Sequence, residues 1–251
     1  MSDSREVVVM RVSPEIKELA DKLSTEFSTQ LVEEHLKAIT SVGERAPGSP
    51  AEARACDYIK SRLKEYGVPH RVHVAEVYFS YGDKKASVEV VSPQNKSLPA
   101  YGGAYSFSTP PEGLEGTMIY AEQGTPETFK KIDAKGKILL ENMIGLFLLS
   151  PHEQTRWAEN VGAKGLVLIG TRLAEMYCIR YDYGNPTRET WGTQPKIPVL
   201  VISRENGDYL KSLLGKGDVQ VSLKTNVWKG WTRALLPKAT IRGRTDPEKF
   251  V

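Results

Sequence analysis

The stretch "GKILLENMIG" (136–145), followed by "WAENVGAKGLVLIG" (157–170), decides the fold class of this chain. In the first stretch a Gly-Lys turn precedes an uninterrupted apolar run (138–140), a pattern typical of a buried strand. In the second stretch an amphipathic helix ends in a glycine-rich turn and leads into another apolar run (165–169). A strand, a helix and a strand at this spacing predict a right-handed crossover between two parallel strands.

Strand and helix patterns continue on both sides of this unit. Residues 196–226 predict a strand, a helix capped by Ser203, a tight turn and a final strand. Before the unit, apolar residues recur at every second position from His70 onward, and a similar run covers 86–91, which predicts two further strands. Taken together, the patterns predict a mixed α/β fold.

The first 67 residues are mostly helical in their pattern. In "ERAPGSPAEARACDYIKSRLKEYG" (44–67), Ser49 lies directly before a proline and three residues before Glu52, which predicts a capping box at the start of a helix. In such a box the Ser49 hydroxyl accepts from the amide of Glu52, and the Glu52 carboxylate reaches back to the amide of Ser49. Gly67 is placed to end this helix, and two earlier helices should be separated by a break near Ser28.

Composition and charge exclude several classes of protein. With 40% hydrophobic and 26% charged residues the chain is an ordinary folded protein, and its net charge of +3 is spread among interspersed acids and bases, so no nucleic-acid partner is expected. No apolar run is long enough for a signal peptide or a membrane span, which predicts a cytoplasmic protein without a membrane partner. Cys56 and Cys178 lie far apart, and we expect free thiols.

Three stretches in order resemble the signature of the protease-associated (PA) domain. They are the two stretches quoted first and "IPVLVISRENGDYLKSLL" (197–214), an Ile-Pro-led strand that enters a helix. The stretch "EEHLKAITSVG" (33–43), together with the capped helix, is similar to the start of the co-catalytic zinc aminopeptidases. That group includes bacterial leucyl aminopeptidases, glutamate carboxypeptidase and the transferrin receptor.

The resemblance implies a chain of two parts. Residues 83–232 would form a PA domain of β-strands with flanking helices, inserted into a helical and two-stranded fragment of a zinc-peptidase fold made by residues 1–82 and 233–251. The implied activity of a complete family member is metal-dependent removal of N-terminal residues from peptides, with zinc as cofactor. The PA domain would shape the access of the substrate.

The sequence departs from the family where the first zinc ligand is expected. In the family a His-x-Asp strand follows the PA domain, whereas "ALLPKATIRGRTDPEKFV" (234–251) matches only the strand and turn before it. None of the four histidines (His35, His70, His73 and His152) stands at a ligand position of the family. We therefore predict no catalytic residue, no metal ligand and no cofactor in this chain, which should be inactive alone. The alternative is a free-standing PA-type module that binds a peptide or a partner protein without chemistry.

A long polar and aromatic segment, 171–196, is the candidate for a binding element. Loops of this length in compact domains are uncommon and tend to be functional or disordered. One hypothesis is a lid over a peptide-binding cleft, with contacts from Tyr181, Tyr183, Arg188 and Trp191. The alternative is that these aromatic residues pack locally to hold the loop, and the sequence leaves both open. An unfinished peptidase sheet would also expose an edge, which predicts a homo-oligomer formed through that edge.

Overall fold

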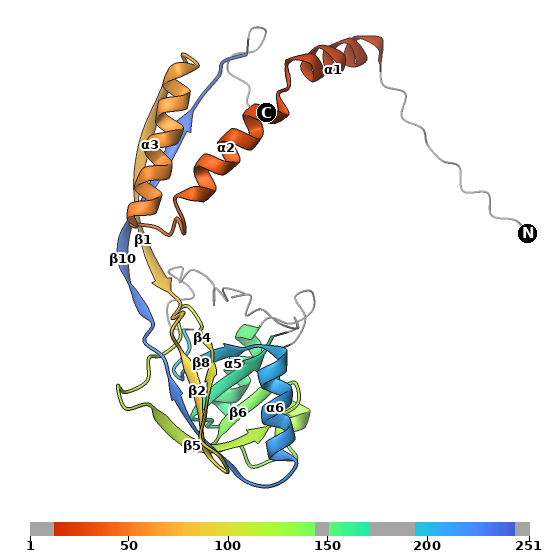
Figure 1. The fold of residues 1–251 in the computed structure, drawn as a ribbon, viewed down its shortest axis with the longest axis vertical. Coiled ribbons are helices and arrows are strands. Elements are labelled where there is room, and N and C mark those ends of the chain that lie inside the picture. The colour runs from red at the N-terminus through yellow and green to blue at the C-terminus, as the bar shows by residue number, and fades with distance from the viewer. Residues whose placement is uncertain (1–12, 144–150, 171–193, 244–251) are drawn as a thin grey trace, which may run out of the picture. The chain divides into compact units, whose positions relative to one another are not determined.

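The computed structural model describes residues 13–143, 151–170 and 194–243. Figure 1 labels most of its elements. The helices are α1 (Pro14–Glu26), α2 (Thr29–Ser41), α3 (Pro50–Glu65), α4 (Pro126–Phe129), α5 (Pro151–Asn160) and α6 (Arg204–Leu214). The strands are β1 (His70–Tyr81), β2 (Ser87–Ser92), β3 (Lys96–Pro99), β4 (Tyr101–Gly102), β5 (Leu114–Tyr120), β6 (Ile138–Asn142), β7 (Gly165–Ile169), β8 (Val199–Ile202), β9 (Val219–Lys224) and β10 (Trp228–Ala239). The mixed α/β class is confirmed.

The chain divides into two compact units. Met1–Ala75 together with Leu235–Val251 forms one, which we call the helical unit, and Glu76–Ala234 forms the other, which we call the sheet unit. Strands β1 and β10 pair with each other in a two-stranded sheet. The identity of the two units as a peptidase fragment and a PA domain stays a prediction.

The sheet unit is built on eight strands in the order β3-β2-β9-β5-β6-β7-β8-β4. Strands β5, β6, β7 and β8 run parallel to their neighbours in this series, whereas β9 is antiparallel to both β2 and β5. The parallel pairing of β6 with β7 through α5 confirms the strand, helix and strand unit predicted from the sequence. The sheet is therefore mixed, because antiparallel pairs that involve β2, β3, β4 and β9 lie on either side of the parallel strands β5 to β8.

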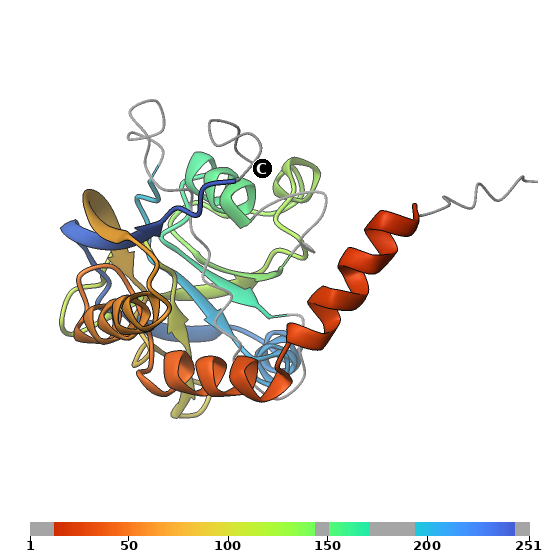
Figure 2. The same ribbon diagram turned by 90° about the horizontal axis from the view of Figure 1, so that it is seen from above.

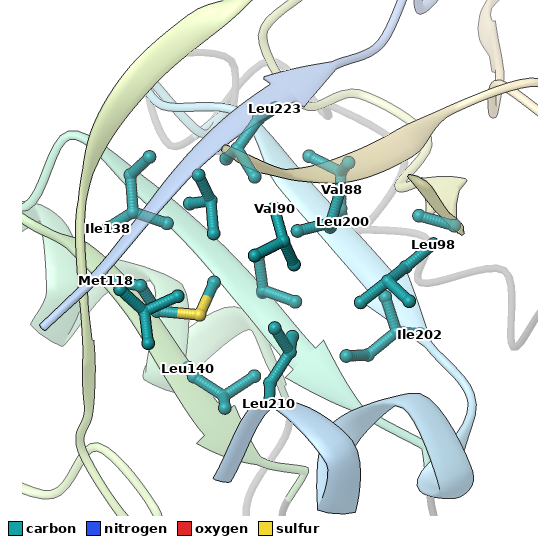
Figure 3. Close-up of a cluster of buried hydrophobic side chains, with 14 of the residues drawn as sticks. Val88, Val90, Leu98, Met118, Ile138, Leu140, Leu200, Ile202, Leu210 and Leu223 are labelled. Atoms are coloured by element: carbon teal, nitrogen blue, oxygen red, sulfur yellow. The ribbon is translucent and has the colours of Figure 1, made fainter. Parts of the chain in front are cut away.

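Both faces of the central strands are buried, so these strands read as continuous apolar runs in the sequence. Successive side chains of a strand point to opposite faces. Ile138 and Leu140 therefore join one cluster with Leu210 of α6, and Leu139 joins a second cluster with Ala158 of α5. Figure 2 shows the strands between the green α5 and the light-blue α6. Figure 3 shows the first cluster, in which side chains from β2, β6, β8 and α6 point toward one another.

The serine cap of α3 confirms one half of the predicted capping box. The Ser49 hydroxyl accepts a hydrogen bond from the amide of Glu52 at 3.0 Å. The other half of the prediction is wrong, because the amide of Ser49 already donates to the carbonyl of Ala46 at 3.0 Å. The Glu52 carboxylate accepts instead from the amide of Gly48 at 2.8 Å and from the amide of Leu235 at 3.0 Å.

Helix α3 ends as its sequence predicts. Gly67 has a φ of +66°, a left-handed conformation that suits glycine. Its amide donates to the carbonyl of Lys64 at 3.0 Å, and the amide of Val68 donates to the carbonyl of Leu63 at 2.8 Å. This pattern satisfies carbonyl groups that the last turn of a helix leaves unpaired. The predicted break between α1 and α2 is also confirmed, since Ser28 caps α2.

The helical unit buries little apolar surface in its described part. Its buried apolar residues are all small: Ala46, Ala51, Ala55 and Cys56, the last a free thiol as predicted. The apolar stripe of α1 has the predicted helical spacing but is uncovered, since Ile16, Leu19, Leu23 and Phe27 are 57–63% exposed. An amphipathic stripe of this kind is the face by which a helix normally packs.

Candidate functional site

The parallel strands bring their carboxyl ends to one edge of the sheet, and in open α/β sheets ligands bind beyond such an edge. We call this region, formed by the ends of β5, β6, β7 and β8, the carboxyl edge. Tyr120 ends β5, Asn142 ends β6 and Gly170 follows β7. The proposed lid segment follows β7 directly in the chain, but its four residues Tyr181, Tyr183, Arg188 and Trp191 lie outside the described residues.

A buried carboxyl group lies on the α5 side of the carboxyl edge. Glu141 of β6 is completely buried, and its Oε2 accepts a hydrogen bond from Nε2 of Gln154 at 3.1 Å. The same Nε2 lies 3.1 Å from the carbonyl oxygen of Gln123 and 3.0 Å from that of Asn142. Oε1 of Glu141 has no hydrogen-bond partner among the described residues. Gln154 thus links α5 to β6 and to the loop that follows β5.

Burial controls the protonation of this group. Removal from water disfavours the charged form and raises the pKa of Glu141 to about 8, although the hydrogen bond from Gln154 acts in the opposite direction. The carboxyl group is therefore mostly neutral at pH 7. Since the carboxyl group is also completely buried, it contacts neighbouring parts of the protein and not solvent.

The loop after β5 closes tightly over this carboxyl group. Glu122 has a φ of 52° and Gly124 a φ of +60°. A Cβ atom at position 124 would lie 2.2 Å from the Glu141 carboxyl oxygen Oε2, so glycine is required there by space as well as by backbone conformation. The carbonyl of Glu122 accepts from the amide of Asn142 at 2.6 Å. Left-handed conformations at non-glycine residues concentrate at functional sites, which marks this loop as part of the candidate site.

A solvent-accessible pocket lies on the α6 side of the carboxyl edge. It has a volume of about 390 Å³ and is lined by Asn142, Met143, Ile169, Gly170, Arg204, Asp208 and Lys211. Asp208 pairs with Nζ of Lys211 at 2.7 Å and lies 4.0 Å from Nε of Arg204. The hydrogen bond from Lys211 lowers the pKa of Asp208, which keeps that carboxylate charged. The pocket therefore presents both positive and negative groups.

Neither the buried carboxyl group on the α5 side of the carboxyl edge nor the residues of the pocket on its α6 side were predicted from the sequence. Glu141 is a charged residue within an otherwise apolar strand, and that anomaly was the signal available. The pocket residues Arg204, Asp208 and Lys211 share one helix face by their spacing, but their position at the carboxyl edge follows only from the order of the strands.

The histidines are spread over the chain. His35 of α2 contacts the hydroxyl groups of Tyr58 and Tyr66 at 2.7 and 3.0 Å and so joins α2 to α3. His70 and His73 lie on β1, and the side chain of His152 is outside the described residues. In the described part of the chain, no three His, Cys, Asp or Glu side chains come together in a group that could hold a metal ion.

No protein-family model matches the sequence. Over 226 residues, 86% of this chain and 42% of the relative, the chain is 25% identical to the probable lipoprotein aminopeptidase LpqL of Mycobacterium tuberculosis. The fold is similar to that of BSAP, a zinc aminopeptidase from Bacillus subtilis, with a TM-score of 0.63 and 19% identity over 84% of this chain and 46% of that one. The chain is similar to part of the zinc aminopeptidases.

Two further solved structures have the same fold. An aminopeptidase from Aneurinibacillus sp. strain AM-1 matches with a TM-score of 0.63 and 19% identity over 85% of this chain and 48% of that one. A peptidase M28 precursor from Shewanella amazonensis matches with a TM-score of 0.68 and 20% identity over 93% of this chain and 56% of that one. This chain thus spans about half the length of these relatives. No helix in the described ranges is both long and apolar enough to cross a membrane.

Proposed function

We propose that this chain is the N-terminal and PA-domain portion of a metal-dependent aminopeptidase and that it shapes the access of peptides to the catalytic centre. The fold match carries the proposal, because it extends over 84–93% of the chain in the peptidase structures. That coverage is more than the sheet unit alone could supply, so the helical unit takes part in the likeness. The sequence relative, whose name also says aminopeptidase, supports the same proposal.

The proposal assigns a role to each unit. The sheet unit would be the PA domain, with the boundaries 83–232 expected from the sequence. The helical unit would be a fragment of the peptidase fold, and its uncovered apolar residues support this assignment because another part of the enzyme would cover them.

Zinc chemistry belongs to the complete enzyme in this proposal. The described residues do not fit a zinc site, since a co-catalytic site needs several His and carboxylate ligands directed into one cavity. The contribution of this chain would be to orient and admit peptides, with the lid candidates Tyr181, Tyr183, Arg188 and Trp191 as contacts.

The intact mass of the protein purified from its native source tests the proposal. A mass clearly above the 27.9 kDa of this chain, together with zinc-dependent release of an aminoacyl chromophore by that larger protein, is the expected result. A native mass equal to 27.9 kDa would contradict it. Zinc-dependent hydrolysis by the purified chain itself would also contradict the assignment of a non-catalytic role.

The second candidate function is a stand-alone PA-type module that binds a peptide or a partner protein. The pocket at the carboxyl edge favours it, because Arg204, Asp208 and Lys211 line a solvent-accessible cavity in which their two positive charges outnumber the one negative charge. Calorimetric titration of the purified chain with short peptides would test this function. Binding should weaken in an Arg204→Gln/Lys211→Gln variant, and equal binding by both proteins would exclude the pocket.

Two further expectations remain proposals. A homo-oligomer formed through the open edge of the sheet would appear in light scattering as a mass at least twice that of the chain, and a monomer would refute it. A cytoplasmic location would appear in cell fractionation, whereas recovery with membranes would refute it. The second test is informative because the curated relative is called a lipoprotein.

A further inference from the structure

The helical unit contains a basic groove at the end of its two-stranded sheet. The groove is lined by the start of β1 with the three residues before it and by the end of β10 with the residues that follow, and its volume is about 690 Å³. Four of its lining residues carry basic side chains, namely His70, Arg71, Lys238 and Arg242. None of the described residues that line it is acidic.

The positive charge of the basic groove is not neutralised within the described part of the chain. Arg71, Lys238 and Arg242 form no ion pair with any described carboxylate. The carboxylate of Glu65, at the nearby end of α3, is engaged by Arg62 at 2.7 Å. Like charges gathered along a concave surface raise the local potential and attract an oppositely charged partner.

Apart from Thr240, the other described lining residues of the basic groove are apolar or glycine. Val68, Pro69 and Ile241 contribute to its lining, and the Ile241 side chain is 83% exposed. An exposed isoleucine beside arginine and lysine groups offers a contact for an apolar side chain of a partner. Nδ1 of His70 donates to the carbonyl of Val68 at 2.9 Å, which leaves Nε2 for other partners.

We propose that the basic groove binds an acidic peptide segment that also carries apolar side chains. Charge complementarity selects an anionic partner, and the apolar lining favours a polypeptide over a nucleic acid. Single-stranded nucleic acids are held by aromatic side chains on which bases stack, and among the described lining residues His70 supplies the one aromatic ring. The site is distinct from the carboxyl edge, because the groove belongs to the helical unit and the carboxyl edge to the sheet unit.

The test measures binding of fluorescein-labelled peptides to the full chain by anisotropy. The probe is a short peptide of alternating glutamate and leucine, and its neutral counterpart has glutamine in place of glutamate. The Arg71→Gln/Arg242→Gln variant removes two exposed charges from the basic groove. Its matched control, Lys17→Gln/Lys22→Gln, removes two exposed charges from α1. Circular dichroism of each variant checks that the fold is kept.

The acidic peptide should bind more tightly than the neutral one, and its affinity should fall as salt is raised. Two exposed ion pairs predict that the Arg71→Gln/Arg242→Gln variant weakens binding by about twofold to about thirtyfold, with no change in the control. Equal losses in both variants would overturn the proposal, because they would report overall charge only. Absence of binding, or tighter binding of a single-stranded oligothymidylate than of the acidic peptide, would overturn it as well.

Discussion

Replacing Glu141 with glutamine should remove a pH dependence of stability that the wild-type chain shows. Burial raises the pKa of Glu141 from an ordinary value of 4.5 to about 8, so the folded state holds this proton more tightly than the unfolded state does. The stabilisation is fully present below pH 4.5 and is lost as the pH rises through about 8. At about 1.4 kcal/mol for each factor of ten, the total is on the order of 5 kcal/mol as an upper bound.

Urea denaturation between about pH 5 and about pH 9 measures this effect. The free energy of unfolding of the wild type should fall over that range, and that of the Glu141→Gln variant should fall much less. The variant should also carry a pH-independent loss of stability, because the new amide would be a buried donor without an assigned acceptor, so the difference between the two proteins changes with pH around this offset. The matched control is Glu115→Gln, which removes an exposed carboxylate from β5 of the same unit. Parallel pH dependences in the wild type and the Glu141→Gln variant would refute the assignment of a raised pKa.

Three further predictions concern the loop after β5, the cap of α3 and the lid. Gly124→Ala places a Cβ atom against a buried carboxyl group and should lower the free energy of unfolding by about 2–4 kcal/mol. The control Gly136→Ala, at a position with open space around it, should lower it by about 1 kcal/mol. Similar urea midpoints for the two variants would contradict the close contact at position 124. Ser49→Ala should cost about 1 kcal/mol in the same assay, and no loss would mean that the cap contributes nothing. Tyr183→Ala/Trp191→Ala in a complete enzyme should raise KM for peptides, and unchanged kinetics in a folded variant would count against a lid.

The central part of the fold could be predicted because its signals are local. An apolar run between glycine-rich turns fixes a buried strand, and β6, α5 and β7 follow one another within a short stretch of sequence. The serine caps at Ser49 and Ser203 were predictable for the same reason, since each accepting hydroxyl lies three residues from its donor.

Features that depend on distant residues could not be predicted. The Glu52 carboxylate has two candidate donors nearby in sequence, but its second partner, Leu235, is 183 residues away. The raised pKa of Glu141 is caused by its burial, which the contacts of its carboxyl group with Gln154 and with the loop at Gly124 accompany. The sequence pattern does not predict that these segments come together. The apolar spacing of α1 is typical of a helix, yet these side chains are exposed, because burial depends on what packs against the helix and not on the spacing.

The double role of Glu52 has a consequence for how the two segments of the helical unit are joined. The Glu52 side chain accepts hydrogen bonds both from Gly48, just before α3, and from the amide of Leu235. The residues before and after the sheet unit are therefore hydrogen-bonded to each other directly. The paired strands β1 and β10 also leave side by side, which is the geometry that tolerates insertion and excision of a whole domain. A shortened chain with a glycine-serine linker in place of Glu76–Ala234 should therefore keep the hydrogen bond between Glu52 and Leu235. Slow hydrogen exchange of the Leu235 amide would show that this bond is kept.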